Sequence, residues 1–132
     1  GNLAFETCLA AMPNNEAKAY AFNKGLDTEV ATSVRTALVA GFQRPIQRNL
    51  LEPFVNLYFD NLIKAWESKS YEGAAKFVTG MYPSWIISQS TLDKTDAWLQ
   101  GLGKDAPAVL RKLVKEAQDG VIRALKVQAL DN

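Results

Sequence analysis

Two pairs of carboxylates come closest, by residue type and spacing, to catalytic chemistry in this sequence. Asp93 and Asp96 are three residues apart, and so are Glu116 and Asp119, which places each pair on one face of a helix. A buried carboxylate pair can share a proton, act as general acid and base, or hold a cation. Lysines lie beside both pairs, so we expect solvent-exposed charged faces rather than a catalytic centre.

A pair of arginines offers the second kind of chemistry. Arg44 and Arg48 are one helical turn apart and could bind the carboxylate of a peptide through bidentate hydrogen bonds. The same spacing also fits a surface group that balances Glu52. We favour the surface group and keep the peptide contact as the alternative.

The residues that are missing exclude most other chemistry. The chain has no histidine, so it holds neither a Ser-His-Asp triad nor a His-x-x-x-His zinc pair. Its one cysteine, Cys8, has only leucine and alanine after it and is expected to be a buried packing residue. The loop Gly101–Asp105 contains a lysine but lacks the spacing of a phosphate-binding loop. We therefore assign no catalytic residue and no metal ligand to this sequence.

The elements that must position these residues are all expected to be helices, because no alternating run of Val, Ile and Thr suggests a strand. Helical periodicity and Pro or Gly punctuation predict seven or eight helices. They lie near residues 5–12, 16–23, 28–40, 45–49, 51–67, 71–82, 90–101 and 105–129, and Asp105 with Pro107 is expected to open the last one.

The helix ends are predicted from cap residues. The expected N-caps are Asn14 or Asn15, Asp27 or Thr28, Ser70, and Ser90 paired with Asp93. Gly25 is expected in the left-handed position after the second helix, and Gly41 is expected to end the third. The short connections favour antiparallel neighbours.

The stretch LLEPFVNLYFDNLIKAW (residues 50–66) carries the widest apolar stripe. Its apolar residues cover about 180° of a helical wheel, whereas a helix on a surface needs about 100°. This width indicates a helix with neighbours on more than one side, in the middle of a stack. The alternative is a peptide-binding groove lined by Tyr58, Phe59 and Trp66, and we favour the core.

The last predicted helix has a narrow stripe of about 120° and a charged opposite side. That pattern is typical of the terminal helix of a stack, whose outer side nothing covers. The sequence therefore predicts an all-α fold in which antiparallel helix pairs stack as an α-α superhelix, like HEAT and armadillo repeats.

Composition fits one helical domain over residues 1–132. Hydrophobic residues make up 48% of the chain, and the net charge is +1 without a basic cluster, so we expect neither nucleic acid nor a membrane as a partner. No apolar run is long enough to span a bilayer. No signal peptide opens the sequence and only one cysteine is present, so we expect a cytoplasmic location. Gly1 and Asn2 are not an initiator methionine and are expected to be left from a tag or a cut.

Three segments carry a resemblance to a known family. GFQRPIQRNLLEPFVNLYFDNL (Gly41–Leu62), TLDKTDAWL (Thr91–Leu99) and APAVLRKLVKEAQDGVIRALKVQALD (Ala106–Asp131) resemble the C-terminal end of aminopeptidase N, a zinc-dependent family, in its actinobacterial-type members. The likeness covers about residues 17 to 132 and consists of hydrophobic and punctuation positions. It implies that the chain is a fragment of the family's all-helical C-terminal domain.

The resemblance implies a role without chemistry. Zinc would be held by a His-Glu-x-x-His helix and a downstream glutamate in a separate catalytic domain of the same chain, and none of those motifs occurs here. The fragment would wall the substrate chamber and restrict the entry of peptides. A free-standing helical-repeat scaffold that binds a protein is the alternative. An enzyme that uses only the two carboxylate pairs is a third, weaker possibility.

Overall fold

The structure is a computed structural model, and it describes residues 3–42, 48–67 and 70–131. Within these residues nine helices and no strand are present. They are α1 (Leu3–Ala11), α2 (Asn15–Leu26), α3 (Thr32–Phe42), α4 (Arg48–Leu51), α5 (Phe54–Asp60), α6 (Leu62–Trp66), α7 (Tyr71–Gly80), α8 (Gln89–Gln100) and α9 (Ala108–Asp131).

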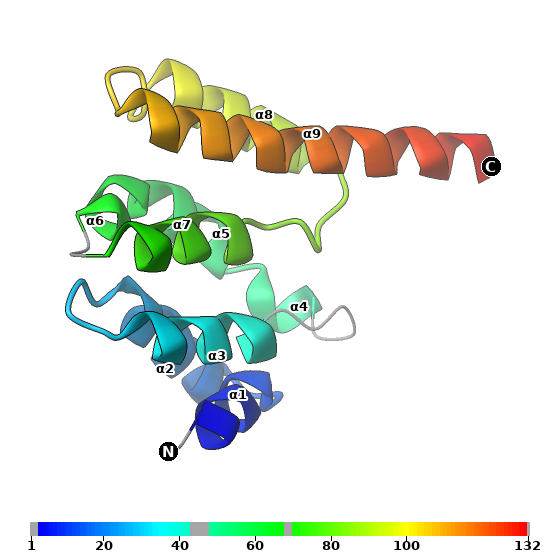
Figure 1. The fold of residues 1–132 in the computed structure, drawn as a ribbon. Helices are drawn as coiled ribbons and strands as arrows, with labels where there is room; N and C mark the ends of the chain where they lie inside the picture. The colour runs from blue at the N-terminus through cyan, green and yellow to red at the C-terminus, as the bar shows by residue number, and fades with distance from the viewer. Residues whose placement is uncertain (1–2, 43–47, 68–69, 132) are drawn as a thin grey trace.

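The helices stack in the order of the chain (Figure 1). The helix α1 forms one end, followed by the pair α2 and α3, then the layer of α5, α6 and α7, and finally the pair α8 and α9. This arrangement confirms the predicted all-α fold of stacked helices. In the part of the chain that the structure describes, no helix is long and apolar enough to cross a membrane.

The number of helices exceeds the predicted seven or eight because the long helix expected over residues 51–67 is divided. Asn61 lies between α5 and α6 with φ −112° and ψ 7°, outside the helical range. Its side-chain amide donates to the carbonyl oxygen of Leu57 at 2.8 Å. A short amide side chain that bonds to nearby backbone competes with helical hydrogen bonds, which explains the interruption.

Two of the five predicted helix starts are confirmed, and the start expected at Asp105 is wrong because α9 begins at Ala108. The side chain of Asn14 accepts a hydrogen bond from the backbone of Ala17 at 2.7 Å, and Ser70 caps α7 in the same way through Gly73 at 3.1 Å. The start expected at Ser90 is wrong, since Ser88 caps α8.

The start expected at Asp27 or Thr28 is also wrong. The side chain of Asp27 instead accepts from the backbone of Glu29 at 2.9 Å. This local turn satisfies the carboxylate inside the loop, so α3 begins only at Thr32.

Both glycines expected at helix ends lie inside helices. Among the described residues no glycine has a positive φ. The carbonyl oxygen of Gly25 accepts a hydrogen bond from Nε of the buried Arg35 at 2.7 Å. This side chain satisfies the carbonyl group at the end of α2, so a left-handed residue is not needed there. Gly41 is one residue before the end of α3, where a Cβ atom would lie 2.0 Å from the carbonyl oxygen of Thr7. Its role is therefore to let α1 and α3 approach closely.

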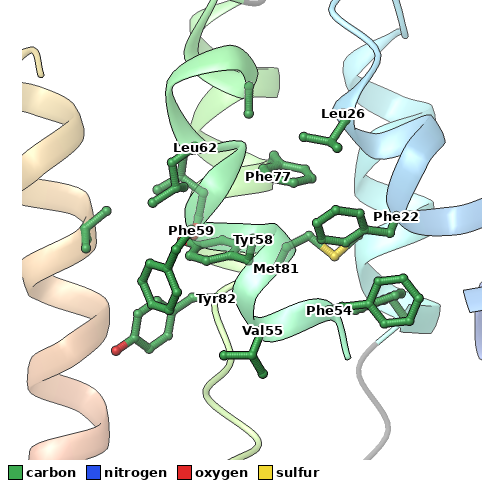
Figure 2. Packing of buried hydrophobic residues seen from close by; sticks show 14 of the residues in the cluster. Phe22, Leu26, Phe54, Val55, Tyr58, Phe59, Leu62, Phe77, Met81 and Tyr82 are labelled. Atoms are coloured by element: carbon green, nitrogen blue, oxygen red, sulfur yellow. The ribbon is translucent and has the colours of Figure 1, made fainter. Parts of the chain in front are cut away.

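The core is built around aromatic rings that join the layers (Figure 2). Phe22 of α2 lies 5.3 Å from Phe54, 5.7 Å from Phe77 and 6.1 Å from Phe42 between ring centroids. These distances are typical of favourable aromatic pairs. One ring of α2 thus contacts side chains from α3, α5 and α7.

The wide stripe of residues 50–66 is confirmed as core. Tyr58 and Phe59 are buried, and the Tyr58 hydroxyl donates to the carbonyl oxygen of Val78 in α7. Burial raises the pKa of Tyr58 well above its ordinary value. Trp66 is half-buried and Ile63 is 42% exposed. The groove considered for Tyr58, Phe59 and Trp66 is not found with that lining, because Tyr58 is packed inside the stack; of the three residues, Phe59 lines a hollow of the described surface.

We expect Gly41→Ala to destabilise the chain by about 1–3 kcal/mol, because the new methyl group must push α1 away from α3. Gly120→Ala is the matched control, since nothing lies closer than 4.0 Å to a Cβ atom at Gly120, in α9. Alanine there should stabilise by about 0.5–1 kcal/mol through helix propensity. Urea unfolding followed by circular dichroism measures both, and equal effects of the two substitutions would contradict the close approach at Gly41.

Candidate functional site

The two carboxylate pairs do not form a catalytic centre in this structure. All four side chains are exposed. Asp93 accepts a hydrogen bond from Gln89 at 2.9 Å, and Asp96 accepts one from Gln118 at 2.8 Å. Glu116 and Asp119 line a shallow hollow of α9 together with Arg111, Lys112 and Lys115. The solvated faces expected from the neighbouring lysines are confirmed.

The described residues contain no candidate metal site. There, no group of three His, Cys, Asp or Glu side chains is close enough to hold a metal ion. The whole sequence also lacks histidine, a common zinc ligand.

The arginine pair stays a prediction. Arg44 lies outside the described residues, and of Arg48 only the backbone, as the first residue of α4, is described. A contact between these two side chains and a peptide carboxylate is taken up again below as part of the proposed function.

A groove lies between α5 and α8. It has a volume of about 350 Å³ and is lined by Asn56, Phe59, Asp60, Lys94, Ala97, Trp98 and Leu102. The rings of Phe59 and Trp98 are buried and form its apolar floor, whereas Leu102 is 64% exposed. Asp60 and Lys94 add opposite charges. Such a groove can accept an apolar side chain with polar groups beside it.

The loop Gly101–Asp105 shapes one wall of this groove. A Cβ atom at Gly103 would lie 2.4 Å from the ring of Trp98, so the loop packs directly on that ring. Arg111 donates to the carbonyl oxygens of Leu99 at 2.8 Å and of Gly103 at 2.6 Å. The lysine-containing loop therefore packs against the protein interior. Arg111 stabilises this loop through its hydrogen bonds, whereas the sequence placed Arg111 on the charged side of the last helix. Sequence reasoning missed this groove because its two walls are about 40 residues apart along the chain.

Sequence reasoning also missed two buried cations. Lys18 donates from Nζ to the carbonyl oxygens of Ala10 at 2.6 Å and of Phe42 at 3.1 Å, which joins the ends of α1 and α3. Arg35 donates to the carbonyl oxygens of Gly25 at 2.7 Å and of Asp27 at 3.0 Å. Burial lowers the pKa of the Arg35 guanidinium below its ordinary value, and the charge of Asp27 opposes that shift. Both cations satisfy backbone carbonyls, which is a structural role.

The sequence contains a pattern from which the burial of both cations could have been predicted. Lys18 lies beside Ala17 and one turn before Phe22, and Arg35 lies one turn before Leu38 on an otherwise apolar face. A single cation on an apolar face is expected to find backbone acceptors when it is buried.

At the end of the stack formed by α1, the prediction for Cys8 is wrong. Cys8, predicted to be buried, is exposed, and Phe5 and Met12 are exposed as well. The inner side of α1 carries Glu6, which accepts a hydrogen bond from Lys24 at 2.7 Å. Hydrogen bonds to Glu6 and then to Tyr20 raise the pKa of Lys24. The helix therefore turns its charge inward and its apolar residues outward.

Comparison with known proteins identifies the domain. Residues 2–123 match the family model described as the ERAP1-like C-terminal domain. Aminopeptidase N of Streptomyces lividans is 40% identical over 126 residues, which are 95% of this chain and 14% of that protein. The chain thus spans about one seventh of the length of this relative. By its matched residues and its stack of helices, the chain belongs to the ERAP1-like C-terminal domain family and resembles the corresponding part of an aminopeptidase N.

Proposed function

We propose that residues 1–132 form one non-catalytic helical domain, a part of the C-terminal domain of a zinc aminopeptidase that removes N-terminal residues from peptides. The observation that carries this proposal is the 40% identity to an aminopeptidase N across 95% of the chain. The absence of histidine from the sequence agrees with it, because zinc would then be held by the catalytic domain of the same chain.

The domain would act through its shape. Stacked helix pairs form a curved surface, which we propose to be a wall of the substrate chamber that restricts the entry of peptides. The groove between α5 and α8, with Asp60 and Lys94 beside an apolar floor, offers a place where a peptide could lie against that wall. Arg44 and Arg48 are the proposed contacts for a peptide carboxylate. The cytoplasmic location expected from the sequence belongs to the same proposal, and fractionation of the source cells tests it.

The test compares the natural full-length protein with a form that lacks residues 3–132. The full-length protein is expected to hydrolyse a chromogenic aminoacyl substrate and short peptides in a zinc-dependent reaction, and to spare a folded protein with the same N-terminal residue. The shortened form should still hydrolyse the small chromogenic substrate but should no longer discriminate against the folded protein. The purified 132-residue chain should hydrolyse none of them, with or without added zinc.

Two results would contradict the proposal. Zinc-dependent turnover by the purified 132 residues would show that the domain is itself catalytic. A natural reading frame that starts directly before Leu3 would favour the free-standing scaffold instead.

A further inference from the structure

We propose that the groove between α5 and α8 binds a free amino acid with a large apolar side chain, held between the carboxylate of Asp60 and the ammonium group of Lys94. The inference deepens the proposed function and rests on it for the source of the ligand, because an aminopeptidase releases amino acids of this kind. The choice of ligand itself follows from the residues that line the groove.

The floor of the groove provides the apolar half of the site. Phe59 of α5 and Trp98 of α8 line it and are buried. Figure 2 shows the ring of Phe59 on the side of α5 that faces the layer of α8 and α9. Leu102, which also lines the groove, is largely exposed, so a bound apolar side chain would remove part of its surface from water. Burial of apolar surface is the main favourable term in binding of this kind.

Opposite charges stand on the two walls of the groove. Asp60 is the last residue of α5, and Lys94 belongs to α8. The two groups do not form an ion pair with each other, since the ion pair found among the described residues joins Lys24 and Glu6. A carboxylate and an ammonium group that line one groove without pairing leave space between them for a ligand with both complementary charges.

The α5 wall supplies the hydrogen-bond acceptors. Asn56 precedes Asp60 by one helical turn, so the two side chains lie on one face of α5, and both line the groove. The carboxylate of Asp60 and the amide oxygen of Asn56 can both accept from an ammonium group, which has three donors. The ammonium group of the ligand therefore lies toward α5.

The α8 wall supplies the donors. Trp98 follows Lys94 by one helical turn, and both line the groove. The indole Nε1 of Trp98 is buried and has no hydrogen-bond partner among the described residues. A buried donor without an acceptor is unfavourable, and a carboxylate is a strong acceptor for both an ammonium group and an indole N–H. The carboxylate of the ligand therefore lies toward α8, which completes the pattern of a zwitterionic amino acid.

The size of the groove favours one amino acid over a longer peptide. Its volume of about 350 Å³ is near the lower end of the range of about 300–1,000 Å³ for small-molecule sites. An internal residue of a peptide carries neither terminal charge and would leave Asp60 and Lys94 without partners. A small side chain such as that of alanine would leave the apolar floor uncovered. Leucine, methionine and phenylalanine are therefore the expected ligands.

The test uses the natural full-length protein and photo-leucine, a leucine analogue with a diazirine in its side chain, in the millimolar range. After illumination, the labelled positions are located by mass spectrometry of the peptides that contain residues 54–60 and 94–102. Labelling of these peptides is expected, and an excess of leucine should abolish it. Absence of label from both peptides would overturn the inference.

Competitors without one charge test whether the groove recognises the zwitterion. Leucinamide lacks the carboxylate and N-acetylleucine lacks the ammonium group. Each should compete about fivefold less well than leucine, which corresponds to about 1 kcal/mol for an exposed ion pair. N-acetylleucinamide lacks both charges and should compete least. If it competes as well as leucine, the groove binds apolar side chains without regard to charge, and the inference is wrong.

Substitutions in the groove give a second measurement. Lys94→Gln and Asp60→Asn should each weaken the competition by leucine about fivefold. Ala97→Phe should abolish the labelling, because Ala97 is exposed and lines the groove, so the larger ring would fill it. Lys126→Gln on the exposed side of α9 is the matched control and should change nothing. Circular dichroism checks that each variant is folded. Equal labelling of Ala97→Phe and Lys126→Gln would contradict the site.

Hydrolysis of a chromogenic aminoacyl substrate is measured on the same preparation, which separates the two proposals. If the full-length protein shows zinc-dependent activity but the two groove peptides stay unlabelled, the amino-acid site is refuted and the proposed function stands. If the groove is labelled with the expected charge preference in a protein without zinc-dependent activity, the site stands and the proposed function is refuted.

Discussion

Replacing Arg35 with methionine is expected to lower the free energy of unfolding by about 3–5 kcal/mol, because buried carbonyl oxygens lose a charged donor. Arg35 is fully buried and donates to the carbonyl oxygens of Gly25 and Asp27 at 2.7 and 3.0 Å. Its Nη1 would be 2.9 Å from a Cβ atom at Gly73, so the guanidinium also packs against α7. One side chain therefore joins α2, α3 and α7.

The measurement for Arg35→Met is urea unfolding followed by circular dichroism. Arg123→Met is the matched control, since Arg123 is exposed on α9, and surface substitutions usually change stability by less than about 0.5 kcal/mol. Arg35→Lys should lie between the two, because an ammonium keeps the charge but cannot donate in two directions from a planar fork. A decrease of the free energy of unfolding by less than about 1 kcal/mol for Arg35→Met would contradict the proposed structural role, since it is smaller than the contribution of one hydrogen bond to a charged group.

Phe22→Ala is expected to destabilise the chain by about 3–5 kcal/mol, the usual cost of removing a buried aromatic ring. Phe22 is buried, and its ring lies within 6.1 Å of Phe42, Phe54 and Phe77 between centroids. Because these rings belong to different layers, the cavity would weaken the contact between α2 and the rest of the stack. Domains of this size are stable by only about 5–15 kcal/mol, so the loss would be a large part of the total.

Phe5→Ala is the matched control for Phe22→Ala in the 132-residue chain. The same atoms are removed, but the Phe5 side chain is largely exposed, so the expected change is within about 0.5 kcal/mol. Thermal and urea unfolding of both variants give the comparison. Equal losses would show that Phe22 does not hold the layers together as the ring distances indicate.

The buried polar groups of the described residues hold the helices together. Among the described residues, the buried charges are bonded to backbone oxygens or, for Glu6, to Lys24, and the paired carboxylates are solvated. Catalysis needs titratable groups in a pocket whose environment changes their pKa values. The groove between α5 and α8 has an apolar floor and two opposite charges, and the proposed contact with a peptide rests on these features.

The helical nature of the chain and the order of its layers follow from the sequence by itself. Apolar periodicity sets where helices form, and the width of each stripe sets how many neighbours a helix needs, so the core position of Tyr58 and the charged outer side of α9 could be predicted. Asn14 and Ser70 could be predicted as caps because a cap acts within three residues.

Only the tertiary structure decided which side of α1 faces inward and which polar groups became structural. The inward position of Glu6, the close approach at Gly41, and the carbonyl oxygens bound by Lys18 and Arg35 each depend on a group 8 to 34 residues away. Local patterns report the preference of one segment for burial, whereas these contacts arise from the relative placement of two segments. Cys8 was expected inside for the same reason, and it lies outside because the geometry of α3 determines which side of α1 can approach it.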